Sequence, residues 1–406
     1  MAKFRLAHLG LAMAALSFTA ATPLFGLSSA YAAESVRPEV GKPLQEAQAL
    51  IKAGKNKEAL AKLREADAAA GKNANESFLV DRVRASAAMG AGDYDLAAKT
   101  FEELIASGRL SAKEKESFSE GLIGIYMRAK DYGKANAAIQ RQLKEHYDPK
   151  LQAYLLQNYY AQGNTAAVLD AVRAEEKAGR VPSEDMYGMV ANLQNKSGDK
   201  NGYVQTIEKL AAHYPKERYW QDLLNRVQGK SGFSSRLAVD VYRLKLANNL
   251  MKKPSEYLEM GQLVLQARAP AEAQKVVAAG YKAGALGVGS DAARHQRLKD
   301  LADKDAAEQV KNAAAQEASL NKEKDGDGLV ALGYGLVQAG QTDKGLKMID
   351  AAIKSGNVKN VEEAKLHQGE AYLAAGNKAK AIQTFKTVGG NDGSADLARY
   401  FIMTAK

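Results

Sequence analysis

The sequence predicts an all-α protein, built as an α-solenoid of about ten stacked antiparallel helix hairpins. Three observations lead to this fold class. Helix-forming residues such as Ala, Leu, Lys, Glu and Gln recur throughout, whereas Pro occurs only 8 times in 406 residues. Few runs show the strict alternation of apolar and polar residues that a half-buried strand needs. Finally, one short turn pattern returns at nearly regular intervals along the chain.

The first segment, residues 1–32, has the pattern of a secretory signal peptide. Lys3 and Arg5 precede a largely apolar stretch, and Ala30-Tyr31-Ala32 offers small residues for cleavage after Ala32. An uncleaved membrane anchor is the alternative, although Thr, Pro and Gly residues interrupt the apolar run. We therefore expect an exported protein that resides in a bacterial periplasm, with no stable membrane insertion after cleavage.

Composition limits the possible functions. The chain has no Cys, which excludes disulfides, Cys-based metal sites and thiol chemistry. The formal net charge of +10 becomes +8 once Lys3 and Arg5 are removed with the signal segment. Because Lys and Arg are interleaved with Asp and Glu, we interpret them as a solvated surface. A basic face that binds an anionic polymer or a membrane surface stays open as the alternative.

The recurring turn consists of a small residue and Gly, then Asp or Asn, with an Ala early in the next helix. Gly tolerates the left-handed backbone that ends a helix, and Asp or Asn can cap the following one. Gly54 and Gly92 lie 38 residues apart, and Gly340 and Gly376 lie 36 apart. The long interval between Gly198 and Gly340 predicts about four further units, with weaker turns expected near Ser234, Ala269-Pro270 and Lys304.

Single repeats resemble the tetratricopeptide repeat family, most closely at Gly369, Tyr372, Gly376, Ala381 and Phe385. The resemblance extends over residues 44–215 and 323–390 and is degenerate between them. It implies a right-handed superhelix whose first helices line a concave groove for peptides or partner proteins. We accordingly divide the chain into a signal peptide (1–32), an N-terminal array (33–215), a degenerate helical-hairpin region (216–322), and C-terminal repeats with a capping helix from Ser394 to Ala405 (323–406).

One segment interrupts this regularity. Residues 291–324 are rich in Ala and in charged residues. They predict either a long exposed helical pair or a semi-rigid connector between two arrays.

No motif indicates catalysis, a cofactor or a metal. The histidines, His8, His146, His213, His295 and His367, are too far apart in sequence to form a helical His pair for zinc. The Gly-rich segment 284–290 lacks the Lys-Ser/Thr of a phosphate-binding loop. Residues 325–328 begin like a calcium loop but continue with apolar residues, so they predict a capping turn. We predict a protein that is not an enzyme; the alternative is a catalytic site hidden in 216–322.

If the hairpins stack as the resemblance implies, eight side chains of first helices face the groove. Their Arg, Lys and amide groups suit the carboxylates and backbone amides of an extended peptide. These residues are Arg82, Ser86, Met89, Arg128, Gln157, Tyr160, Asn192 and Lys196. The alternative is that they are ordinary exposed helix residues, with Tyr160 part of a packed tyrosine cluster. The predicted function is a periplasmic scaffold for a protein or peptide partner, in envelope assembly or secretion, without nucleic acid binding; the oligomeric state is left open.

Overall fold

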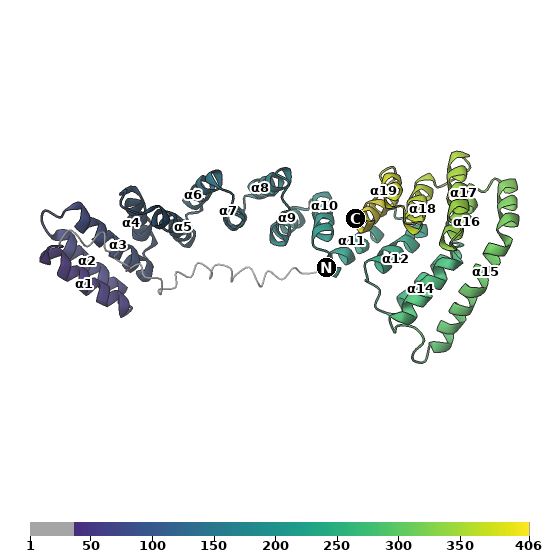
Figure 1. Cartoon of the computed structure of the whole chain (residues 1–406), viewed down its shortest axis with the longest axis horizontal. Helices are drawn as coiled ribbons and strands as arrows, with labels where there is room; N and C mark the ends of the chain where they lie inside the picture. Colours follow the sequence, from purple (N-terminus) through teal and green to yellow (C-terminus); the bar gives the residue numbers. More distant parts are fainter. Residues whose placement is uncertain (1–35, 406) are drawn as a thin grey trace. The chain divides into compact units, whose positions relative to one another are not determined.

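The computed structural model describes residues 36–405, and these residues are helical without any strand (Figure 1). This confirms the predicted all-α solenoid. The signal segment and its cleavage site lie outside the described residues. Within the described residues, no helix combines the length and the apolar character needed to cross a bilayer.

The chain forms two compact units that meet in sequence between Ala174 and Glu175. The N-terminal unit consists of consecutive hairpins, and its last helix runs three residues past the boundary. The helices are α1 (Pro38–Lys52), α2 (Asn56–Ala68), α3 (Ala74–Ala91), α4 (Tyr94–Ala106), α5 (Ala112–Arg128), α6 (Tyr132–Glu145), α7 (Pro149–Ala161) and α8 (Thr165–Lys177).

The C-terminal unit begins with regular hairpins and becomes less regular in the middle. The predicted boundaries at residues 215 and 322 both fall inside it. Its helices are α9 (Glu184–Ser197), α10 (Lys200–His213), α11 (Glu217–Gln228), the short 3-10 helix η2 (Ser235–Leu237), α12 (Ala238–Ala247), α13 (Pro254–Gln266), α14 (Pro270–Lys282), α15 (Ala292–Glu323), α16 (Gly326–Gln338), α17 (Thr342–Lys354), α18 (Val361–Ala374), α19 (Lys378–Phe385) and α20 (Ser394–Ala405).

The turns between paired helices have the geometry that the sequence predicts. Gly92 ends α3 with φ of 75°, a left-handed conformation that favours Gly. The Asp93 carboxylate then accepts a hydrogen bond from the backbone N–H of Leu96 at 3.1 Å and caps α4. The same cap recurs at Asp131, Asn164, Asp199, Asp325 and Asn377. The predicted turn at residues 325–328 is thereby confirmed.

Small residues let the paired helices approach closely. The early Ala of the second helix is fully buried in several hairpins, at Ala59, Ala97, Ala135 and Ala381. In the best-matching repeat, a Cβ on Gly369 would lie 2.4 Å from the Phe385 ring, so α18 and α19 require Gly there. The family resemblance therefore reflects real steric constraints.

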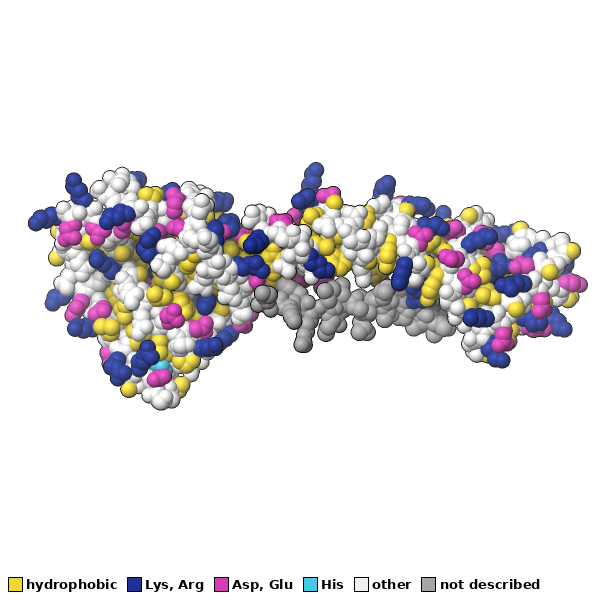
Figure 2. All heavy atoms as spheres, turned by 180° about the vertical axis from the view of Figure 1, so that it is seen from behind, with side chains coloured by type: hydrophobic (Ala, Val, Ile, Leu, Met, Phe, Trp, Pro, Cys, Tyr) yellow, Lys and Arg dark blue, Asp and Glu magenta, His cyan; other side chains and the backbone are white. Residues whose placement is uncertain are grey.

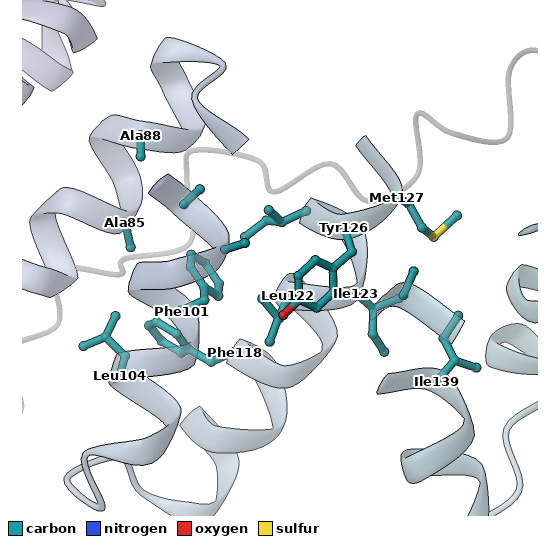
Figure 3. Close-up of a cluster of buried hydrophobic side chains, with 14 of the residues drawn as sticks. Ala85, Ala88, Phe101, Leu104, Phe118, Leu122, Ile123, Tyr126, Met127 and Ile139 are labelled. Atoms are coloured by element: carbon teal, nitrogen blue, oxygen red, sulfur yellow. The ribbon is translucent and has the colours of Figure 1, made fainter. Parts of the chain in front are cut away.

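The core of the N-terminal unit is continuous from one hairpin to the next. Figure 3 shows side chains from α3 to α6 converging between the helices, with Phe101 and Phe118 at its centre. Their ring centroids lie 4.9 Å apart. A single hairpin could not bury this surface, so each hairpin depends on its neighbour for stability.

Tyrosine side chains of first helices fasten neighbouring hairpins together. The Tyr187 hydroxyl on α9 donates to Glu176 on α8 at 2.9 Å, and Lys209 on α10 pairs with the same carboxylate at 2.7 Å. The equivalent set in the N-terminal unit is Tyr126, Glu102 and Lys134. At α7 the Tyr159 hydroxyl instead accepts from the neutral Gln140 amide at 2.8 Å. We call each set a tyrosine clasp.

Helix α15 differs from both expectations for residues 291–324. It is one continuous helix of 32 residues, so the prediction of a turn near Lys304 is wrong. The predictions of an exposed helical pair and of a semi-rigid connector are wrong as well. The reason is a buried stripe on one face, which packs on α13, α14 and α16. The stripe consists of His295, Leu298, Ala302, Ala306, Gln309, Ala313 and Leu320. The turns expected near Ser234 and Ala269-Pro270 do occur.

The last helix closes the C-terminal unit. As predicted, Ser394–Ala405 forms a helix, α20, that covers α18 and α19. It also contacts α10 and α12 at the beginning of the unit. Asp396 pairs with Lys230 at 2.9 Å, and Arg399 pairs with Glu208 at 3.0 Å. The end of the unit is thus joined to its start.

Candidate functional site

The N-terminal unit contains an open groove of about 1100 Å³ between α4, α5 and α6. Its floor consists mainly of small or apolar side chains, namely Ile105, Ala106, Gly108, Ala112, Ser119, Leu122, Ala137 and Ala138. Charged side chains of both signs form the rim, namely Glu102, Lys115, Glu116, Glu120, Lys134, Arg141 and Glu145. A floor made mainly of small side chains allows a polypeptide backbone to come close, while the rim can pair with its charges.

One tyrosine clasp forms part of the groove wall. Tyr126 donates its hydroxyl proton to Glu102, and the Lys134 ammonium lies 5.4 Å from the Tyr126 ring centre. Burial and the neighbouring Glu102 carboxylate raise the pKa of Tyr126 well above its usual value. The hydroxyl therefore stays protonated at neutral pH and holds α4, α5 and α6 in a fixed relation.

The eight residues predicted to bind a partner lie on α3, α5, α7 and α9, and none of them lines this groove. Arg82 has a packing role: it pairs with Glu114 on α5 at 2.8 Å and lies over the rings of Phe78 and Phe118. Arg128 and Lys196 are exposed, while Ser86, Met89, Gln157, Tyr160 and Asn192 are half-buried. Asn192 and Lys196 belong to the C-terminal unit. A binding role for these residues stays a prediction.

The groove residues were missed because the resemblance directed attention to first helices alone. The groove is lined by two second helices, α4 and α6, together with the first helix α5. A usable signal exists in the sequence: Ala and Ser recur at exposed or half-buried positions of three consecutive helices, where Lys and Glu are usual on a solvated surface.

Charge is distributed evenly over the visible surface of each unit. Figure 2 shows Lys and Arg scattered among Asp and Glu on the face that it presents, without a continuous basic stripe there. This agrees with the interleaved charge pattern of the sequence.

The C-terminal unit contains a buried charged cluster where α12, α14, α16 and α18 meet. At its centre, the Arg243 guanidinium donates to Asp240 at 2.7 Å and to Glu370 at 2.8 Å. It also makes a bidentate contact with Glu272, at 2.8 and 2.7 Å. The Tyr334 ring lies against the guanidinium at 4.4 Å. All four charged side chains are buried.

The pKa values of two carboxyl groups in this cluster, Glu370 and Asp240, shift in opposite directions. Burial raises the pKa of Glu370 well above its usual value, and the nearby Asp240 and Glu272 charges add to the rise against the opposing effect of Arg243. Burial alone would raise the pKa of Asp240 too, but His367 and Arg243 outweigh it and hold that pKa below its usual value. Of the two carboxyl groups Asp240 and Glu370, Asp240 is therefore the ionised one.

A cleft of about 310 Å³ leads to this cluster, between α12, α13, α16 and α18. Arg243, Tyr334 and His367 line it, and Arg236 at its edge pairs with Glu363 at 2.7 Å. Asp240, His367 and Glu370 present three atoms that could ligate a metal, all within 4.8 Å of one another. The spacing of the histidines excludes only a helical His–His pair, whereas this group joins His367 and Glu370 to a carboxylate from a distant segment.

Two segments of the chain match the tetratricopeptide repeat. They are residues 82–148, which contain the groove, and residues 330–395, which contain the Gly369–Phe385 contact. No curated protein matches the chain. Among solved structures, one chain of "Structure of Naa15/Naa10 bound to HypK-THB" is similar, with 16% identity and a TM-score of 0.31. The match covers 87% of this protein and 58% of that chain. Tetratricopeptide repeats are in general binding modules for proteins, which supports a role as a protein–protein interaction scaffold.

Proposed function

We propose that this protein is a non-catalytic scaffold that binds an extended or helical segment of a partner protein in the groove between α4, α5 and α6. The groove itself carries the proposal, because it lies within a matched tetratricopeptide segment and joins a floor of small residues to a charged rim.

The rim indicates what kind of segment would fit. The groove is lined by cations and anions alike, namely Lys115, Lys134, Arg141, Glu102, Glu116, Glu120 and Glu145. A segment with charges of both signs would therefore be recognised better than a uniformly charged one. Affinity would come mainly from apolar side chains placed over Ile105 and Leu122, since exposed ion pairs contribute little.

The proposed place of action is the bacterial periplasm, in envelope assembly or secretion. The support for this is the signal-like sequence of residues 1–32, with Lys3 and Arg5 before an apolar stretch and small residues at the expected cleavage site. Fractionation of cells that produce the tagged full-length chain tests it: the protein should be recovered in the periplasmic fraction, shortened after Ala32.

The binding proposal can be tested by filling the groove. Ala137 is exposed on the groove floor, so Ala137→Trp would block the groove without disturbing the core. Ala153 on α7 is equally exposed and does not line the groove, so Ala153→Trp is the matched control. Residues 33–406 of each variant are used to capture partners from envelope extract, at low and moderate salt.

We expect one protein partner that the unmodified chain and Ala153→Trp retain at both salt concentrations and that Ala137→Trp loses. Equal retention by both variants would place the binding surface elsewhere. Capture of anionic polymer or lipid alone, lost as salt is raised, would favour a basic binding face over the scaffold.

A further inference from the structure

We propose that Asp240, His367 and Glu370 form a binding site for one divalent transition-metal ion in the C-terminal unit, with Zn²⁺ as the best match. This site is separate from the proposed partner-binding groove and does not depend on it.

The backbone brings the three side chains together. His367 and Glu370 are three residues apart on α18 and therefore project from the same face, one turn apart. Asp240 comes from α12 and is fully buried against them. Zinc bound to His and carboxylate ligands at about 2.0–2.2 Å in a tetrahedron separates its ligand atoms by roughly 3.4 Å. The three atoms lie within 4.8 Å of one another, so modest side-chain rotations would complete the site.

Two buried carboxylate oxygens in this group, Asp240 Oδ2 and Glu370 Oε1, make no hydrogen bond within the described residues, and the buried His367 Nε2 lies 3.2 Å from Asp240 Oδ1. The Asp240 and Glu370 side chains are 0% and 3% exposed, so these oxygens are shielded from bulk water. Leaving such atoms unsatisfied is costly. A single cation would satisfy both oxygens and could take His367 Nε2 as its third ligand.

Arg243 determines which oxygens are left for the ion. Its guanidinium binds Asp240 Oδ1 and Glu370 Oε2, which leaves Oδ2 and Oε1 as the unsatisfied oxygens. Hydrogen bonds to the other oxygen of a carboxylate ligand orient it at metal sites. Arg243 is itself held by Glu272 and the Tyr334 ring, so the arrangement is rigid.

Charge balance points to a divalent ion. The three carboxylates of Asp240, Glu272 and Glu370 surround the single guanidinium of Arg243, which leaves two uncompensated negative charges if all three are ionised. A buried net charge is unfavourable unless it is paired. One divalent cation with a neutral His367 would make the cluster neutral.

The ligand set and the cleft favour zinc over other divalent ions. One imidazole nitrogen and two carboxylate oxygens resemble three-ligand zinc sites that keep a fourth position for water. Ca²⁺ and Mg²⁺ prefer six or more oxygen ligands, which this pocket does not provide among the described residues. His367 lines the cleft of about 310 Å³, so the proposed site lies beside an opening to solvent.

The test uses tag-free residues 33–406, freed of metal with a chelator and then titrated with ZnCl₂ in a calorimeter. We expect one Zn²⁺ per chain. Co²⁺ should produce the visible absorption of a tetrahedral site and be displaced by Zn²⁺. His367→Gln and Glu370→Gln should each weaken Zn²⁺ binding by about 10-fold or more.

Glu363→Gln is the control, because Glu363 lies on the same helix α18 and pairs with Arg236 at 2.7 Å but is not one of the three ligands. It should retain a stoichiometry of one. Circular dichroism checks that each variant is folded, and His367→Gln is the safest substitution because its side chain is 18% exposed. If the unmodified chain binds no Zn²⁺, or if His367→Gln binds as well as the control, the proposal is wrong.

Discussion

Replacement of Arg243 by Met should be among the most destabilising single changes in the C-terminal unit. Arg243 donates four hydrogen bonds to three buried carboxylates, and Met would retain the apolar volume but none of these bonds. Removing one partner of a buried ion pair costs about 3–5 kcal/mol, because the remaining charges stay buried without compensation. For a unit of this size, that corresponds to a fall of roughly 6–20 °C in Tm.

The single tryptophan makes the measurement specific. Trp220 is 4% exposed and lies in the C-terminal unit, so its fluorescence reports on the unfolding of that unit alone. Circular dichroism reports on helices of both units. Thermal unfolding of Arg243→Met, measured with excess chelator to remove any bound metal, should shift the Trp220 transition and leave part of the dichroism transition in place.

Arg236→Met is the matched control. Arg236 pairs with Glu363 at 2.7 Å, but its side chain is 54% exposed, so its loss should cost no more than about 1 kcal/mol. If both variants lower the Tm of the Trp220 transition by the same amount, burial does not make the Arg243 contacts more stabilising than the exposed Arg236 pair, and the prediction is wrong.

Three further predictions address packing and pH. Phe101→Ala should destabilise the N-terminal unit by about 3–5 kcal/mol, seen as a lower urea midpoint by circular dichroism with an unchanged Trp220 transition. Gly369→Ala should cost about 1–3 kcal/mol because the new methyl group meets Phe385, and an unchanged Trp220 urea midpoint would argue against close packing there. Arg37 and its hydrogen bonds lower the pKa of Glu76 to about 2. Since the unfolded value is about 4.3, this stabilisation is complete above pH 4.3 and is lost as the pH falls towards 2. The difference in urea midpoint between the unmodified chain and Glu76→Gln should therefore be largest at neutral pH and vanish near pH 2.

Much of the fold was accessible from the sequence because the turn chemistry is local. A left-handed Gly followed by a capping Asp, as at Gly92-Asp93, encodes the end of one helix and the start of the next within a few residues. The turn at Lys130 was also found, although a Lys adopts the left-handed conformation there with φ of 59°. Its capping Asp131 carried the signal.

Other features depend on contacts between distant segments and leave no local signal. Helix α15 has no Gly or Pro, and only its packing on three other helices distinguishes it from an exposed helix. The charged cluster brings Asp240 and Arg243 against Glu370, which is 127 residues from Arg243. Charged residues are usually exposed, so the expectation for any one of them was a solvated surface. Nothing within a single hairpin shows that these are buried.

Closure of the C-terminal unit by α20 has an evolutionary consequence. An open array of repeats can lengthen or shorten by whole hairpins, because each hairpin needs only its neighbours. In this unit Asp396 must meet Lys230, Arg399 must meet Glu208, and Glu370 must meet Arg243. Duplication or deletion of a hairpin between α12 and α18 would separate all three pairs at once. The number of hairpins in this half of the protein is therefore fixed by geometry, and relatives should vary there by substitution rather than by repeat number.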